Sequence, residues 1–200
     1  AAGKFRESEE TTHYSIVDAG GNAVSVTTTL NDSYGSRVVV SGGGFILNNE
    51  MDDFSAKPGA SNLYGAVGGK ANAVGPGKRP LSSMTPAIVT KGGQPWLVVG
   101  TPGGTTIPTS VFQIIVDLEE FGMSLPEAVK AGRFHHQWKP DKIFIEEGAF
   151  TEALIQKLSA MGHTVEPRGP IGRVEGIIRL ANGLWQGVAD SRGDDAAAGY

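Results

Sequence analysis

The sequence predicts an α+β fold in which antiparallel β-sheet is layered against helices. Twenty-nine glycines and eleven prolines among 200 residues are typical of many strands joined by tight turns. Hairpin-like pairs of β-branched runs alternate with a few helical segments, and the sequence contains no internal repeat. This order favours a sheet packed by helices over a doubly wound parallel fold. With 40% hydrophobic residues, the chain can bury a core as one domain or as one subunit of a larger protein.

The first half of the chain is predicted to form antiparallel hairpins. β-Branched residues dominate 12–17 and 23–30, and the AGGN between them supplies a hairpin turn. A short strand is expected at 45–47. The following segment 58–77 is rich in Gly, Pro, Ala and Asn, which is typical of a lid or a linker. A second hairpin is expected from two short strands around KGGQ, at 87–90 and 96–99.

The second half is predicted to contain most of the helices. GTPGGTT leads into a helix at 107–121, where Pro108 suits the first helical turn. Ser124 is expected to cap another helix, with Pro126 early in it. The remaining elements are a strand at 142–146, a helix at 151–161 ended by Gly162, and a hairpin turned by Asn182 and Gly183.

Composition excludes several functional classes. The formal net charge is -4, and no run rich in Lys or Arg offers a footprint for nucleic acid. The chain has no cysteine, which excludes disulfides, thiolate metal sites and a cysteine nucleophile. No apolar run reaches the length of a membrane span, and the first residues lack the apolar core of a signal peptide. Any export signal is therefore expected upstream of residue 1.

The pair Thr11-Thr12 stands where a charged segment meets the first predicted strand. Residues 1–10 are polar, carry five charged side chains and are expected to form a mobile tail. A threonine pair in a strand is usually structural. Cleavage between Glu10 and Thr11 would, however, leave a rigidly held N-terminal threonine. Its free α-amine, with a pKa of about 8, could take the proton from its own hydroxyl and activate a weak nucleophile.

Seven blocks of sequence carry a family resemblance. They are TTHYSIVD, GNAVSVTTTLN, NNEMDDFS, GPGKRPLSSMTP, GTPGG, RFHHQW and the terminal AGY. In this order, from Thr11 to Tyr200, they resemble the small subunit of γ-glutamyltranspeptidase, an N-terminal-nucleophile hydrolase. The resemblance implies an αββα sandwich of which this chain is the small-subunit half. Residues 1–10 would then end the large subunit, and 11–200 would form the small-subunit catalytic domain.

The resemblance also implies an activity. The precursor would cut itself at Glu10-Thr11 and then transfer a γ-glutamyl group through a threonyl ester. The donor would be glutathione or another γ-glutamyl compound, and the acceptor water, an amino acid or a peptide. The large subunit of the same precursor would be the partner. No cofactor, metal or nucleic acid is expected, and the family implies a periplasmic or extracellular location.

Four residues match the catalytic positions of the family. Thr11 matches the nucleophile and Thr29 the threonine that hydrogen-bonds it. That contact requires residue 11 to lie opposite residue 29, although the turn alone would equally allow 11 opposite 30. Gly103 and Gly104 match the backbone donors to the oxyanion, because glycines let main-chain N–H groups converge on a small anion. Without the resemblance, this glycine pair would be interpreted as an ordinary strand-to-helix turn.

Six further residues match the substrate-binding positions of the family. A γ-glutamyl group ends in an ammonium and a carboxylate, so its recognition needs opposite charges at a fixed distance. The ammonium side is matched by Asn31, Glu50 and Asp53, the carboxylate side by Ser82 and Ser83, and the lid by Tyr64. Many family members have glutamine at the position of Glu50, and the arginines that complete the carboxylate site lie on the large subunit. Alone, these residues would be interpreted as a solvated turn, a loop serine pair and an exposed loop aromatic.

Three histidines lie within the matching blocks, and two rival functions stay open. His135 and His136 do not predict a metal site, because neighbouring side chains on a strand point to opposite faces and no HExxH is present. His13 is expected in the core, or else tunes the nucleophile. One rival is an acylase of the glutaryl-cephalosporin type, whose substrate lacks the ammonium that Glu50 and Asp53 would bind. The other rival is a non-catalytic or unprocessed binding subunit.

Overall fold

A computed structural model describes residues 11–200, so the expected tail at 1–10 lies outside the described residues. The strands of the described part are β1 (Thr12–Val17), β2 (Ala23–Thr28), β3 (Ala87–Lys91), β4 (Gln94–Gly100), β5 (Phe134–His135), β6 (Ile143–Glu146), β7 (Val165–Arg168), β8 (Glu175–Arg179) and β9 (Trp185–Val188). The helices are α1 (Ile107–Glu119), α2 (Leu125–Lys130) and α3 (Glu152–Ala160), with 3₁₀ turns η1 (Glu50–Asp53), η2 (Lys70–Asn72) and η3 (Gly104–Thr106). The strands form sheets in the orders β1-β2, β3-β4-β8-β9 and β5-β6-β7.

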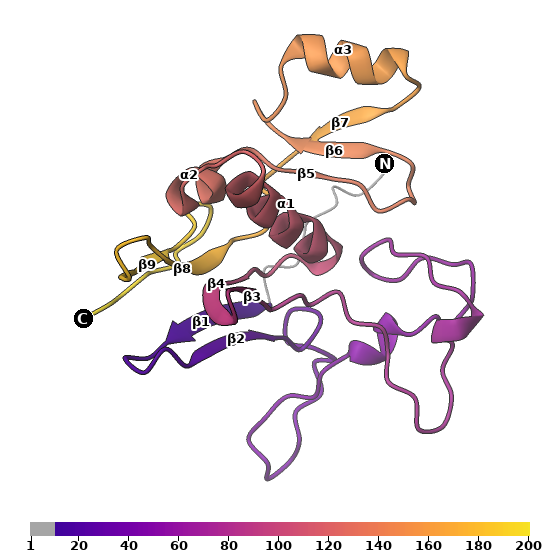
Figure 1. Cartoon of the computed structure of the whole chain (residues 1–200). Coiled ribbons are helices and arrows are strands. Elements are labelled where there is room, and N and C mark those ends of the chain that lie inside the picture. The colour runs from indigo at the N-terminus through magenta and orange to yellow at the C-terminus, as the bar shows by residue number, and fades with distance from the viewer. Residues whose placement is uncertain (1–10) are drawn as a thin grey trace.

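The four-stranded antiparallel sheet is covered on both faces (Figure 1). Helices α1 and α2 pack on one face and the β1-β2 hairpin on the other. Leu97 and Val99 of β4 join the helix-side core, and Val98, fully buried between them, faces the hairpin because strand side chains alternate. Residues 11–200 thus supply two sheet layers and one helix layer of the expected sandwich. On the outer face of the hairpin, Tyr14 and Ile16 are exposed.

The register of the first hairpin is the one that the resemblance implied. Thr12 pairs with Thr28 and Val17 with Ala23, which places residue 11 opposite 29. Strand β2 ends at Thr28, two residues before the predicted end. The Thr29 Oγ1 accepts the Asn31 N–H at 2.9 Å, and Asn31 has a φ of 78°, so the chain turns out of the ladder here.

The strand expected at 45–47 is reduced to an isolated bridge between Val39 and Ile46. Gly42 and Gly44 have φ values of 77° and 70° and form a tight turn. Only a few backbone hydrogen bonds connect the two sides of this turn. These include the bond from Val40 N–H to the Phe45 carbonyl at 2.9 Å. The strand prediction was therefore wrong here, because the flanking glycines favour a turn over a ladder.

The predicted helices are all present, with shorter ends. Helix α1 stops at Glu119 rather than 121, because Gly122 adopts a left-handed φ of 65°. Ser124 caps α2 as expected, and its backbone N–H donates to the Glu127 carboxylate at 2.8 Å. Thr151 caps α3, since its Oγ1 accepts the Leu154 N–H at 3.3 Å.

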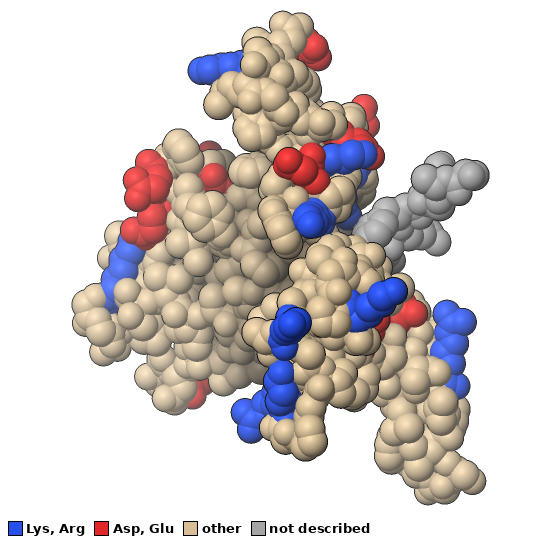
Figure 2. Space-filling view, turned by 90° about the vertical axis from the view of Figure 1, so that its right-hand side faces the viewer, with Lys and Arg blue, Asp and Glu red and all other residues tan. Residues whose placement is uncertain are grey.

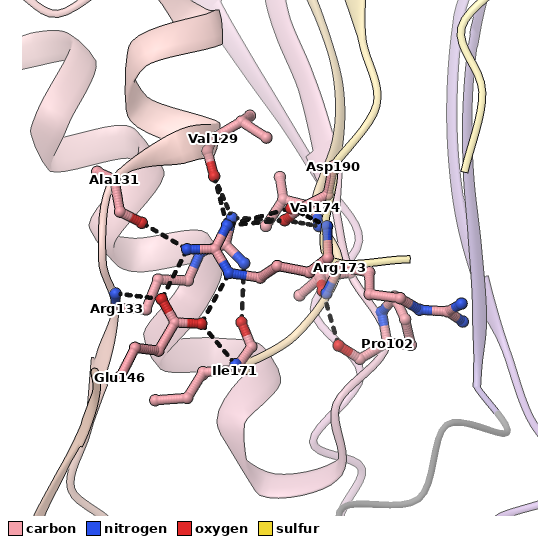
Figure 3. Close-up of polar contacts among 11 residues, drawn as sticks. Pro102, Val129, Ala131, Arg133, Glu146, Ile171, Arg173, Val174 and Asp190 are labelled. Carbon is pink, nitrogen blue, oxygen red and sulfur yellow. Dashed lines mark hydrogen bonds and ion pairs between the residues drawn. The ribbon is translucent and has the colours of Figure 1, made fainter. Parts of the chain in front are cut away.

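Two arginines and two carboxylates form a buried charged network that the sequence did not predict (Figure 3). Arg133 is 2% exposed, and its Nη2 lies 2.7 Å from the Asp190 Oδ2. Arg192 makes two bonds of 2.7 and 2.6 Å to the two oxygens of Glu146. Together they join the residue before β5, the end of β6 and the C-terminal segment. The charges balance, and the backbone groups of Val129, Ala131, Ile171 and Val174 bond to the network.

Figure 2 shows one face of the molecule, on which Lys and Arg side chains stand singly or in small groups, some of them beside Asp or Glu, with uncharged surface between the groups. No continuous basic stripe crosses this face. Among the described helices, none combines the length and apolar character needed to cross a membrane.

Candidate active site

Thr11 lies directly before β1, with its side chain on the inner face of the hairpin. It is 4% exposed, and its Oγ1 donates to the Thr29 Oγ1 at 3.1 Å. Thr29 in turn accepts the Asn31 N–H, so its oxygen is fixed from the backbone side. Thr12, the next residue, points outward and is exposed. In this register the hydroxyl of Thr11 is buried and that of Thr12 faces outward.

Asn31 is buried and connects the threonine pair to two loops. Its Nδ2 donates to the Asn49 carbonyl at 3.2 Å, and the Asn49 side chain accepts the Asp32 N–H at 2.9 Å. The Tyr64 hydroxyl donates to the Asn31 carbonyl. Asn49 was not among the predicted site residues, although it lies within the NNEMDDF run beside Glu50. The sequence could have indicated Asn49 only through its position directly before Glu50.

Tyr64 is not the exposed loop aromatic that its sequence context alone would suggest. It is 9% exposed, and its ring packs against the Gly103-Gly104 turn. A Cβ at Gly104 would lie 2.8 Å from the Tyr64 Cδ1, and Gly104 has a φ of 55°. Both the close ring and the left-handed backbone require glycine here. The segment 58–77 thus folds back over the turn, with a bridge between Ser61 and Val67.

The glycine turn stands at the beginning of η3 and α1. Gly103 has a φ of 141°, and its carbonyl accepts both the N–H and the hydroxyl of Thr106, at 3.0 and 2.8 Å. The first N–H groups of a helix have no partner within the helix and form a site for negative charge. Gly104 is the first residue of η3, so its N–H is one of these groups. The turn can therefore donate to an oxyanion without breaking a helical hydrogen bond.

Several of the predicted anchors line one cavity of about 480 Å³. Asp53, Ser82, Ser83 and Tyr64 are among its lining residues. Glu50 does not line it, although it lies at the start of the same 3₁₀ turn, η1. A neighbouring cavity of about 470 Å³ shares Tyr64 with the first and reaches Gly103. Tyr64 therefore stands between the anchoring residues and the glycine turn.

The Asp53 carboxyl is only partly accessible. Burial raises its pKa to about 6, and the nearby carboxylates of Glu50 and Asp52 add to the shift. The Asp52 carboxylate is itself engaged, since it accepts the Leu63 N–H at 2.8 Å. A cluster of carboxylates that holds one of its members partly protonated is stabilised by a cation.

The histidines occupy structural positions. His13 is buried between the hairpin and Gly100, and its ring nitrogens contact Thr27 and Ser15 hydroxyls at 2.8 and 3.0 Å. Burial lowers the His13 pKa to about 4, which keeps the ring neutral. His135 is buried whereas His136 contacts the exposed Asp141, so the two rings diverge. Within residues 11–200, no group of three His, Asp or Glu side chains could hold a metal ion.

A layered sandwich with a threonine hydroxyl held at the head of its first strand defines the N-terminal-nucleophile hydrolase class. The chain belongs to the gamma-glutamyltranspeptidase family, whose family model matches residues 1–200. It is 51% identical over 195 residues to the glutathione hydrolase proenzyme of Escherichia coli K12, covering 97% of this chain. That match spans 33% of the relative, so the chain spans about a third of the length of this curated relative.

Solved structures of the family have the same fold. The gamma-glutamyltranspeptidase of Pseudomonas nitroreducens, complexed with L-DON, superposes with a TM-score of 0.87 at 48% identity. The match covers 94% of this chain and 99% of that one. A mutant of the Helicobacter pylori enzyme gives a TM-score of 0.86 at 49% identity, covering 91% of this chain and 100% of that one. The family and the sandwich fold expected from the sequence blocks are thereby confirmed.

Proposed function

We propose that this chain carries the catalytic threonine of a γ-glutamyltransferase that also hydrolyses glutathione. The observation that carries the proposal is the buried Thr11 hydroxyl, held 3.1 Å from Thr29 at the head of β1. Relatives at about half identity named glutathione hydrolase proenzymes support the substrate and the maturation step. A large subunit of the same precursor, as in the family, would complete the site with its arginines. A periplasmic or extracellular location is part of the same proposal.

Maturation would use the same hydroxyl as catalysis. Thr11 Oγ1 attacks the Glu10 carbonyl carbon, the peptide C–N bond breaks, and the threonine nitrogen leaves as a free amine. Water then opens the ester, which releases the Glu10 carboxylate and restores the hydroxyl. After this cleavage, residues 1–10 would end the large subunit and residues 11–200 would form the small subunit.

Turnover would repeat the attack on a γ-glutamyl amide. The freed α-amine takes the hydroxyl proton, directly or through water, while the oxygen bonds to the γ-carbonyl carbon. The amide N–H groups of Gly103 and Gly104 would stabilise the oxyanion, and losing one such donor typically costs on the order of 10²- to 10³-fold in rate. The proton passes to the leaving amine, and water or an acceptor amine then releases the glutamyl group.

Substrate recognition would use both sides of the cavity. Asp53, with Asn31 and Glu50 nearby, would bind the ammonium, and the hydroxyls of Ser82 and Ser83 would donate to the carboxylate. Tyr64 would cover the bound group as a lid. The carboxylate cluster around Asp53 supports this assignment, because its repulsion is relieved by a bound cation.

The test compares γ-glutamyl and glutaryl p-nitroanilides, which differ in the α-ammonium, on the full-length processed protein. We expect the γ-glutamyl compound to have the higher kcat/KM by at least about tenfold, because losing one charged contact costs about 1.5–3 kcal/mol. Preference for the glutaryl compound would instead identify an acylase. Intact-mass measurement and N-terminal sequencing accompany the assay, and a permanently uncut Glu10-Thr11 bond would favour a non-catalytic subunit.

The pH profile tests the role of Asp53. Its pKa of about 6 means that the carboxyl gains a proton and loses its charge as pH falls through 6. We expect kcat/KM for the γ-glutamyl anilide to show a break near pH 6, with an added decline of about tenfold per pH unit below it. The terminal amine, with a pKa of about 8, gives a separate decline that begins at higher pH.

Two variants locate that break. Asp53→Asn should lower kcat/KM at pH 8 and abolish the break near pH 6. Asp52→Asn should retain the break but move it to lower pH, because one of the charges that raise the Asp53 pKa is gone. A break near pH 6 that survives in Asp53→Asn would assign the titration to another group and refute the prediction.

A further inference from the structure

The side-chain amide of Gln137 lies where three segments meet. Its Oε1 accepts the Thr105 hydroxyl at 2.7 Å and contacts the His135 Nε2 at 2.8 Å. Its Nε2 donates to the Lys139 carbonyl at 3.0 Å and to the Tyr64 carbonyl at 3.4 Å. Both hydrogens and both acceptor directions of the amide are therefore in use.

The neighbours fix which way this amide points. A rotated amide would place its oxygen against the carbonyls of Lys139 and Tyr64, which cannot donate. With the observed orientation, the His135 Nε2 must carry a proton and donate to the Gln137 Oε1. His135 is 2% exposed, and its Nδ1 lies 2.8 Å from the Thr109 hydroxyl on α1. The amide is thus anchored to the rigid helix layer.

On its other side the amide faces the lid residue. Tyr64 is held by its hydroxyl on Asn31, by its ring on Gly104 and by its carbonyl on Gln137. Thr105, whose hydroxyl donates to the amide oxygen, is the residue directly after Gly104. Gln137 also lines both cavities, as Tyr64 does. One side chain therefore connects the lid to the oxyanion turn and to α1.

We propose that Gln137 is a positioning residue, which fixes the backbone of the 58–77 lid at Tyr64 relative to the Gly103-Gly104 turn. This rests on the proposed function, in which the lid covers the γ-glutamyl group while the turn stabilises the oxyanion. Gln137 contacts neither Thr11 nor the residues that would bind the ammonium. Its effect on catalysis would pass through Tyr64 and Thr105.

The kinetic test is a double-mutant cycle in the full-length processed protein. Gln137→Ala is expected to lower kcat/KM for γ-glutamyl p-nitroanilide about tenfold, since two contacts to the lid and turn are lost. In a Tyr64→Ala background the carbonyl that Gln137 bonds is still present, but the ring and the hydroxyl that this bond would position are gone, so the same change should have an effect of less than about twofold. Equal losses in both backgrounds would overturn the proposal. Gln137→Glu keeps the acceptor oxygens but lacks the N–H donors, so it should fail to restore the activity.

Gln113 offers a matched control. It is buried, whereas Gln137 is half-buried, and its amide bonds to the carbonyls of Thr109 and Phe134 at 2.8 Å each and to the Phe134 N–H at 3.1 Å. None of these partners belongs to the lid or to the glycine turn. Gln113→Ala should therefore lower the thermal midpoint while leaving kcat/KM of the folded protein within about twofold. A tenfold kinetic loss in this variant as well would indicate a general packing effect and refute a positioning role.

A readout without turnover separates this proposal from the proposed function. Backbone hydrogen exchange of residues 62–67 should become at least about fivefold faster in Gln137→Ala and remain unchanged in Gln113→Ala. Unchanged exchange in Gln137→Ala would refute the positioning role even in an active enzyme. If the wild-type protein failed to cleave the γ-glutamyl anilide, the proposed function would fall, whereas faster lid exchange would still support the contact between Gln137 and Tyr64.

Discussion

Replacing Thr11 with alanine is expected to abolish both cleavage before residue 11 and γ-glutamyl transfer. The buried hydroxyl is the only side-chain group that the proposed mechanism uses to attack a carbonyl, and alanine removes its hydrogen bond to Thr29. We expect the precursor to remain intact by mass and kcat/KM for γ-glutamyl p-nitroanilide to fall on the order of 10⁴-fold or more.

Two neighbouring variants make this result specific. Thr11→Ser keeps a hydroxyl beside the future α-amine, so it should still be cleaved and retain measurable turnover. Thr12→Ala removes a hydroxyl that points outward from the hairpin, and we expect normal cleavage. Full maturation of Thr11→Ala, or labelling of another side chain by a mechanism-based glutamate mimic in the mature enzyme, would refute the nucleophile assignment.

The hairpin that carries Thr11 was predictable because its determinants are local. β-Branched runs around AGGN favour two paired strands, and the structure has both. The register was less predictable, since a turn of this length allows more than one pairing. Only the resemblance distinguished residue 29 from residue 30. In the structure the connecting turn fixes it, because the Asp18 N–H bonds to the Asn22 carbonyl at 3.0 Å and the Asp18 carboxylate accepts the Asn22 N–H at 2.9 Å.

The lid contacts were not predictable from the residues themselves. A tyrosine in a loop rich in Gly and Pro is usually exposed, yet Tyr64 is buried against Gly104. Its partners Asn31 and Gln137 lie 33 and 73 positions away along the chain. A single polar side chain at such a distance leaves no periodic pattern. Asn49 and Gln137 were missed although they lie in the matching blocks NNEMDDFS and RFHHQW, because the resemblance assigned substrate binding to other positions, such as Asp53 and Ser82.

The charged network around Arg133 was missed for a related reason. An arginine before a short strand and an aspartate near the C-terminus are ordinary surface residues in a sequence. The network becomes visible only when α2, β6 and the C-terminal segment come together (Figure 3). Although burial opposes ionisation, the Arg133 guanidinium holds the pKa of Asp190 below its ordinary value. The pair is therefore ionised, and its two charges depend on each other.

Replacing Asp190 with alanine is expected to cause the largest loss of stability of any single change in this network. Arg133, 2% exposed, would keep its charge and lose its counterion, and the Val174 N–H would lose its acceptor. Breaking a buried pair from one side typically costs about 3–5 kcal/mol. Urea unfolding should be measured in a Thr11→Ala background, in which both proteins are single uncut chains.

An exposed ion pair of similar length provides the control. Lys142 and Glu166 are 2.7 Å apart, but their side chains are 41% and 47% exposed. Glu166→Ala should therefore cost at most about 1 kcal/mol. Asp190→Asn keeps an acceptor for the Val174 N–H and should lose less than Asp190→Ala. A loss in Asp190→Ala no greater than that in Glu166→Ala would mean that the buried network adds nothing beyond a surface pair, because solvent would then be reaching Arg133.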